Sequence, residues 1–123
     1  MNIGSLVSIV DDDESVREAV PDLLTEFGFE AHAFRSAEDF LASEYVSRTE
    51  CLILDVAMPG MSGPALQQEL VRRRQDIPIV FITAQWDVRI RPRLLEAGAV
   101  ECLFKPFSER QLYDAVSTAL RIN

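Results

Sequence analysis

Short apolar segments alternate along the chain with stretches in which apolar residues recur at helical spacing. The apolar segments are Leu6–Val10, Glu30–Phe34, Cys51–Leu54, Ile79–Ile82 and Glu101–Phe104. Three of them, LVSIV, CLIL and IVFI, are almost continuously hydrophobic, which is typical of strands that are covered on both faces. Five alternations of strand and helix predict an α/β fold in which helices cover both faces of a doubly wound parallel sheet.

The first and last helices carry recognisable starting signals. Ser15 followed by Glu18 resembles a capping box at the start of the first helix, and Ser108 with Gln111 resembles one at the start of the last. Pro21 falls inside the first helical pattern, where it should kink the helix or leave one carbonyl unpaired, because proline has no N–H. Both helices should pack one apolar face on the sheet.

Two of the middle helices are also marked by residues that favour helix starts. One short helix should begin at Ser36, and the next should open with Gly63 and Pro64. The second of these helices is expected to turn four apolar residues inward, namely Ala65, Leu66, Leu70 and Val71.

The fourth helix is compressed between Trp86 and Gly98. A proline is tolerated only in the first turn of a helix. Pro92 therefore predicts that this helix begins near Arg91 and is short, or that its N-terminal part is unwound. Trp86 is as consistent with a partner contact as with loop packing.

Composition narrows the class of protein. The 123 residues predict one domain over residues 1–123, and 48% apolar with 26% charged residues exclude a disordered chain. A net charge of −8 argues against direct binding to DNA or to an anionic membrane. No apolar run could span a bilayer and no export signal is present, so we expect a cytoplasmic location. Cys51 and Cys102 lack metal-site spacing and are expected to be reduced core residues.

Residues able to carry chemistry stand at the ends of the strands. The first strand runs into Asp11 and Asp12, the third ends at Asp55, the fourth at Thr83 and the fifth at Lys105. Right-handed crossovers place these ends at one edge of a parallel sheet. Three carboxylates gathered there would repel one another, and Mg²⁺ suits such oxygen ligands. Asp55 is then a candidate nucleophile toward a phosphoryl group, whose oxygens would meet Mg²⁺, the ammonium and the hydroxyl.

Four sequence motifs, in this order at strand ends, identify a known family. They are VDDDES, LDVAMPGMSG, FITA and AGAVECLFKPF. The chain resembles, over essentially its whole length, the CheY-like receiver domain of two-component response regulators. The resemblance implies a five-stranded parallel sheet in the order 2-1-3-4-5 with five helices. The phrases SAEDFL and AGAVECLFKPF look most like the receivers of FixJ-type regulators, which usually carry a LuxR-type DNA-binding domain behind the receiver.

The resemblance also implies a metal and phosphorylation site. Asp55 would be the phospho-acceptor, served by a partner histidine kinase. Asp12 would bind Mg²⁺ directly and Asp11 largely through water, and the backbone carbonyl of Ala57 would be a further ligand.

A second group of residues would bind the phosphoryl group and transmit the change. Thr83 would donate a hydrogen bond to it, and the small Ala84 would leave it accessible. Lys105 would pair with it, positioned by a cis bond to Pro106. The change would spread to the face made by the fourth helix, the fifth strand and the fifth helix, which would dimerise or release an output domain.

The chain departs from the family pattern at the switch. Cys102 stands three residues before the lysine, where receivers usually carry Tyr or Phe, so the aromatic half of the usual coupling is absent. Phe104 lies on the same side of its strand, because side chains alternate with period two, and could substitute. Ala57 cannot orient a water for hydrolysis of an acyl phosphate.

Two other functional classes compete with a phosphorylation-operated switch. The first is a vestigial receiver, independent of phosphorylation, that acts as a protein-interaction module, and Cys102 and Pro92 motivate it. The second is a phosphatase of the haloacid dehalogenase type, which also uses an aspartyl phosphate. That family places a second Asp two residues after the nucleophile, where this chain has Ala57, so turnover of external phosphoesters is not expected.

Overall fold

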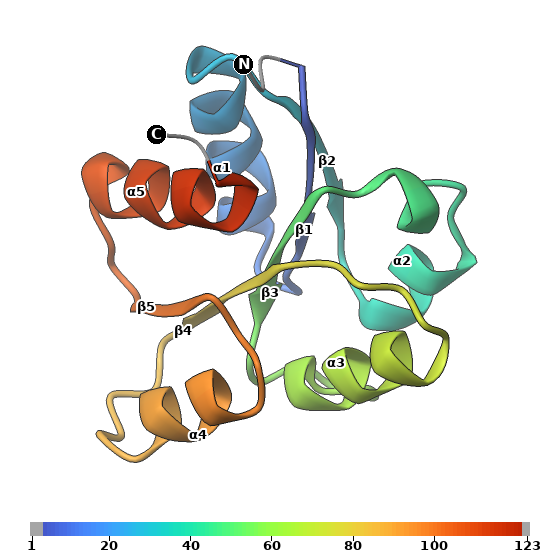
Figure 1. Ribbon diagram of the computed structural model, residues 1–123. Helices are drawn as coiled ribbons and strands as arrows, with labels where there is room; N and C mark the ends of the chain where they lie inside the picture. Colours follow the sequence, from blue (N-terminus) through green and yellow to red (C-terminus); the bar gives the residue numbers. More distant parts are fainter. Residues whose placement is uncertain (1–3, 122–123) are drawn as a thin grey trace.

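The computed structural model describes residues 4–121, which fold into a central parallel sheet covered by helices on both faces (Figure 1). Its five strands are β1 (Leu6–Val10), β2 (Glu30–Phe34), β3 (Cys51–Asp55), β4 (Ile79–Thr83) and β5 (Glu101–Phe104). They are hydrogen-bonded in the order β2-β1-β3-β4-β5, and every neighbouring pair is parallel. The expected strand order and fold class are therefore confirmed.

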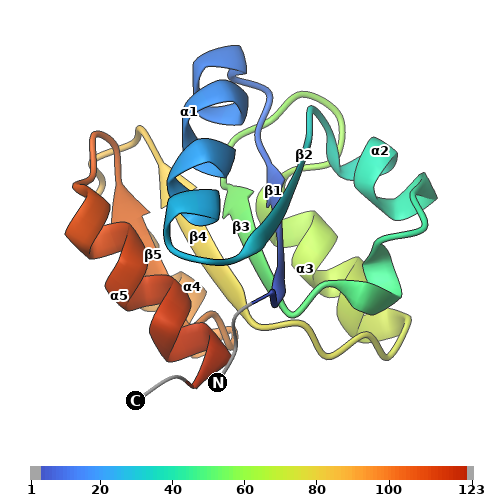
Figure 2. The same cartoon turned by 90° about the horizontal axis from the view of Figure 1, so that it is seen from above.

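The described residues also form five α-helices and one short 3₁₀ helix, of which all but the last α-helix lie between two strands. They are α1 (Glu14–Glu26), α2 (Ala37–Ala42), η1 (Val46–Arg48), α3 (Gly63–Arg72), α4 (Ile90–Glu96) and α5 (Glu109–Leu120). Helices α1 and α5 cover one face of the sheet, and α2, α3 and α4 cover the other (Figure 2). Among residues 4–121, none of the helices is long and apolar enough to cross a membrane.

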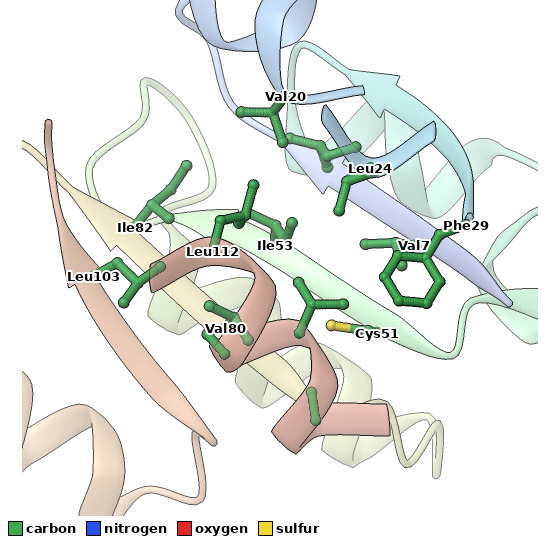
Figure 3. Packing of buried hydrophobic residues seen from close by; sticks show 14 residues of the cluster. Val7, Val20, Leu24, Phe29, Cys51, Ile53, Val80, Ile82, Leu103 and Leu112 are labelled. Atoms are coloured by element: carbon green, nitrogen blue, oxygen red, sulfur yellow. The ribbon is translucent and has the colours of Figure 1, made fainter. Parts of the chain in front are cut away.

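Each face of the sheet has its own hydrophobic core, because alternate strand residues point to opposite sides. On the α1/α5 side, Val7, Ile53, Val80 and Leu103 of the sheet pack against Leu112 and other helix residues (Figure 3). The core on the other face contains Leu54, Phe81 and Cys102 from the strands, with Phe40, Leu66 and Leu94 from the helices. Every residue of strands β1, β3 and β4 is buried, as the continuous apolar sequences of these strands predict.

Helix starts agree with the sequence except at α1. The capping box of Ser108 with Gln111 is present at α5. At α1, however, the predicted pairing of Ser15 with Glu18 is wrong, because Asp13 is the N-cap. Its carboxylate accepts hydrogen bonds from the backbone N–H of Ser15 at 2.9 Å and from the Ser15 hydroxyl at 2.7 Å. The helix continues through Pro21 to Glu26.

Two further expectations concern the helices on the second face. Helix α4 has only seven residues and begins at Ile90, which confirms that it is short and that Pro92 lies in its first turn. In α3, Leu66 and Leu70 are buried as expected, but Val71 is 71% exposed. Gln67, one turn earlier on the same side of the helix, is buried, and its side-chain amide donates to the carbonyl oxygen of Ala97 at 3.3 Å.

Candidate functional site

Three carboxylates meet at the carboxyl edge of the sheet. Asp55 is the last residue of β3, and Asp11 and Asp12 directly follow β1. One oxygen of each lies within 4.8 Å of the others. Asp11 is fully buried, Asp55 is nearly so and Asp12 is exposed, so the cluster is open on one side.

The backbone around Asp11 fixes its side chain at this edge. Its N–H donates to the carbonyl oxygen of Phe34 at 3.1 Å, which extends the pairing of β1 with β2 by one residue. Its own carbonyl accepts from the guanidinium of Arg17 at 3.0 Å. Its carboxylate accepts from the N–H of Asp13 at 2.9 Å. The buried carboxylate is therefore held in one orientation by its own loop.

Lys105 brings a positive charge to the cluster. Its ammonium nitrogen Nζ lies 2.8 Å from Oδ2 of Asp11 and 3.7 Å from Oδ1 of Asp55. The Lys105–Pro106 peptide bond is cis, as the resemblance implies. The backbone N–H of Lys105 also donates to the carbonyl oxygen of Thr83 at 2.8 Å, which joins the ends of β4 and β5. The ammonium is therefore bonded mainly to the carboxylate of Asp11.

Thr83 ends β4 beside these groups and is almost completely buried. Its hydroxyl oxygen accepts a hydrogen bond from the backbone N–H of Gln85 at 3.0 Å, whereas Ala84 between them is exposed. This hydrogen bond was not anticipated from the sequence, because a hydroxyl bonded to the following loop leaves no periodic signal.

The charges of the cluster are poorly balanced without a cation. Burial, with a further contribution from the charge of Asp11, raises the pKa of Asp55 to about 7, although Lys105 opposes this. Burial by itself would lower the pKa of Lys105, but the hydrogen bond and the charge of Asp11 outweigh it and raise the pKa. Three carboxylates and one ammonium leave an excess of negative charge, which a divalent cation would neutralise.

The carboxylate oxygens of the cluster are donors of the kind that Mg²⁺ prefers. Magnesium prefers carboxylate oxygens and water in an octahedral arrangement, and protein sites supply one or two carboxylates while solvent fills the rest. Asp12 provides the exposed side from which an ion and its water would enter. Ala57, the proposed donor of a backbone carbonyl, lies in the exposed loop after β3.

Gly63 fixes the position of that loop, a role that the sequence pattern does not reveal. Its N–H donates to the carbonyl oxygen of Val56 at 3.0 Å. A Cβ atom here would lie 2.3 Å from the backbone oxygen of Asp55 and 3.0 Å from the ring of Phe81. The first residue of α3 must therefore be glycine for the helix to approach the end of β3 so closely.

The other residues that the sequence singled out lie elsewhere. Cys51 and Cys102 are both free and buried, which confirms that they belong to the core. Burial, with the charge of Glu101, raises the pKa of the Cys102 thiol to about 11, so it is unreactive near neutral pH. Trp86 is 70% exposed, and one face of its ring stacks on Phe104.

Comparison with known proteins gives a consistent match. Residues 7–117 match the family model described as response regulator receiver domain. The chain is 43% identical over 115 residues to nodulation protein W of Bradyrhizobium diazoefficiens, and 40% identical over 119 residues to response regulator protein TodT of Pseudomonas putida. These alignments cover 94% and 97% of this chain but 51% and 52% of the two relatives. The chain therefore spans about half the length of the curated relatives it matches.

A solved structure described as FixJ-N has the same fold. It superposes with a TM-score of 0.84 at 35% sequence identity, and the match covers 96% of this chain and 94% of that one. The family match includes the carboxyl ends of β1, β3, β4 and β5, which carry the acidic cluster and Lys105. This chain belongs to the receiver domains of two-component response regulators.

Proposed function

We propose that this domain is a phosphorylation-operated switch in which Asp55 accepts a phosphoryl group from a sensor histidine kinase. The observation that supports this most directly is the position of the Asp55 carboxylate, within 4.8 Å of the two other carboxylates and 3.7 Å from the Lys105 ammonium. An oxygen of Asp55 would form a bond to phosphorus while the bond from phosphorus to the donor's imidazole nitrogen breaks, and that nitrogen keeps the electron pair.

The surrounding residues would neutralise and position the transferred group. Asp11, Asp12, Asp55 and the carbonyl of Ala57 would hold Mg²⁺, which supplies positive charge to the phosphoryl oxygens when bound. Lys105 would exchange its bond with Asp11 for one with the phosphoryl group. The Thr83 hydroxyl would donate to another phosphoryl oxygen, and the exposed Ala84 would leave the group accessible.

Two features favour a response at the surface formed by α4, β5 and α5. Lys105 and Pro106 directly follow β5, and Thr83 lies next to Phe104 in the sheet. Movement of Lys105 or Thr83 would therefore reach β5 and α4 first. We propose that this surface controls dimerisation or an output domain, in the cytoplasm. The curated relatives are about twice as long and include proteins named as transcriptional regulators, which supports a DNA-binding output domain.

Intact mass after incubation with Mg²⁺ and acetyl phosphate tests this proposal. The wild type is expected to gain one phosphoryl group, whereas Asp55→Asn gains none, and the gain should disappear when a chelator removes the metal. Size-exclusion elution of the same samples reports dimerisation. A folded wild type that takes up no phosphate would contradict the switch and favour the interaction module, for which the missing ring at Cys102 is the supporting observation.

Loss of the ammonium should separate phosphorylation from response. Lys105→Ala is expected to take up phosphate roughly tenfold more slowly, because one of the charges that stabilise the transferred group is gone. Its phosphorylated form should also fail to reproduce the elution or partner binding of phosphorylated wild type. Lys105→Arg, which keeps the charge, is the matched control and should retain part of the response. A response of Lys105→Ala equal to that of the wild type would exclude the assigned role.

A further inference from the structure

An exposed ring and a half-buried ring form a stacked pair beside the candidate site. Trp86 lies in the β4–α4 loop (residues 84–89), and Phe104 is the last residue of β5. Their ring centroids are 5.2 Å apart and their planes differ by 23°. Stacking at this distance is favourable even though the outer face of the indole is open to water.

Both rings are linked to residues that would contact the phosphoryl group. Phe104 directly precedes Lys105 and pairs with Thr83 in the sheet. Trp86 follows Gln85, whose N–H is bonded to the Thr83 hydroxyl oxygen at 3.0 Å. The stacked pair is therefore linked to Thr83 through one hydrogen bond on the loop side and through the strand register on the other.

The remainder of the loop is held by its own contacts. Asp87 accepts from the backbone N–H and the guanidinium of Arg89, and its carbonyl accepts from the N–H of Ile90 at 3.0 Å. These bonds close a turn in front of α4. Among the described contacts, the beginning of the loop is tied to the sheet by the bond from Gln85 to Thr83 and by the stacking of Trp86 on Phe104.

There is space into which the indole can move. A groove of about 270 Å³ lies next to the pair, lined by Trp86, Val88, Arg91, Pro92 and Phe104. It is present because α4 begins only at Ile90 and Val88, 85% exposed, leaves the space unfilled. The buried Cys102, in contrast, offers no ring that could change position.

We propose that the Trp86–Phe104 pair transmits the state of Thr83 to the surface beside α4. Rotation of the Thr83 hydroxyl toward a phosphoryl group would remove the acceptor of the Gln85 N–H. The start of the loop would then be released, and the indole would leave Phe104 for the neighbouring groove. The pair thereby performs the transmission that the small Cys102 side chain is unable to perform. This inference rests on the proposed phosphorylation of Asp55.

The fluorescence of Trp86 tests the relay directly, because it is the single tryptophan in the sequence. Emission and acrylamide quenching are recorded with Mg²⁺ alone and with Mg²⁺ plus acetyl phosphate, and intact mass is measured on the same samples. Phosphorylated wild type should show a shifted emission relative to Mg²⁺ alone. Phe104→Leu should be phosphorylated equally but show less than about a fifth of that shift, since the stacked state is already lost. Val71→Ala, at an exposed position of α3 that does not line this groove, should retain the full shift.

A second measurement needs no phosphorylation. In free Thr83→Val the Gln85 N–H has lost its acceptor, so the quenching constant of Trp86 should rise about twofold over wild type as the loop opens. Unchanged quenching in Thr83→Val, or unchanged emission in wild type that has gained one phosphoryl group, would overturn the relay while leaving the phosphorylation chemistry intact. Absence of any mass gain would instead overturn the proposed function, and the relay with it.

Discussion

Metal-free Asp55→Asn is expected to be more stable than the wild type at pH 8, by about 2 kcal/mol of unfolding free energy. The wild-type carboxylate is buried next to Asp11, and its pKa is raised from 3.8 to about 7, chiefly by burial. Ionised Asp55 is therefore a destabilising charge until a cation compensates for it. Asparagine keeps the shape of the side chain and removes the charge.

The pH dependence of this difference follows from the direction of the shift. Between about pH 4 and pH 7 the folded protein retains a proton on Asp55 that the unfolded chain has released, so this group makes stability fall as the pH rises through the window. Below the window both states are protonated, and above it neither is. The advantage of Asp55→Asn should therefore be smaller at pH 5 than at pH 8 and constant above about pH 8.

Urea unfolding in the presence of a chelator, at several pH values between about 5 and 8, measures this difference in unfolding free energy. These pH values lie on both sides of the raised pKa of Asp55, which is about 7. Asp22→Asn, at an exposed position of α1, is the control and should stay within about 0.5 kcal/mol of the wild type throughout. Millimolar Mg²⁺ should raise the stability of the wild type by mass action and that of Asp55→Asn much less. An advantage that is independent of pH, or a less stable variant at pH 8, would contradict the assignment.

Gly63→Ala is expected to destabilise the fold by about 2–3 kcal/mol, because the added methyl group overpacks a buried contact. Helix propensity alone predicts the opposite sign, since alanine in place of glycine stabilises a helix by about 0.5–1 kcal/mol. The tertiary contact should dominate, because the new Cβ would lie 2.3 Å from the backbone oxygen of Asp55. Helix α3 would have to move away from the end of β3.

The same displacement should reach the site. The loop after Asp55 is tied to α3 through the bond from the Gly63 N–H to Val56, so the affinity for Mg²⁺ is expected to fall several-fold. Urea unfolding measures the stability and magnesium titration measures the affinity. Gln68→Ala, at an exposed position of the same helix, is the matched control and should change neither. A Gly63→Ala protein more stable than the wild type would show that the close approach can relax without cost.

The sequence was sufficient to predict the five strands, the five α-helices and the residues that gather at the edge of the sheet, but not the 3₁₀ helix Val46–Arg48. Continuous apolar runs mark strands that are buried on both faces, and strand–helix alternation permits few arrangements. The acidic residues and Lys105 stand at the ends of these strands, so their meeting at one edge was predictable before any distance was known. The cis peptide bond before Pro106 came from the family resemblance and is present. The chemical roles of these residues stay predictions.

Two expectations from the sequence were wrong, at the start of α1 and in α3, because other side-chain contacts are formed there. Ser15 and Glu18 fit a capping box, but Asp13 lies two residues earlier and its carboxylate accepts both polar hydrogens of Ser15. In α3, Val71 is apolar and Gln67 polar, yet Gln67 is buried and Val71 is exposed. The two residues lie one turn apart on the same side of the helix, so the pattern of residue types does not separate them. The burial of Gln67 accompanies its hydrogen bond to the carbonyl oxygen of Ala97, a contact between elements that the pattern does not specify.

The sequence by itself determined the order of elements, the sheet that they form and the edge at which Asp11, Asp12, Asp55, Thr83 and Lys105 gather, because hydrophobic periodicity and strand ends are local properties of the chain. Only the tertiary structure decided that Lys105 bonds to Asp11 more closely than to Asp55, that Gly63 leaves no room for a methyl group, and that Trp86 stacks on Phe104. These contacts join residues that are distant in sequence or belong to different elements. Their distances depend on how helices and loops pack on the sheet, which a one-dimensional pattern of residue types does not specify.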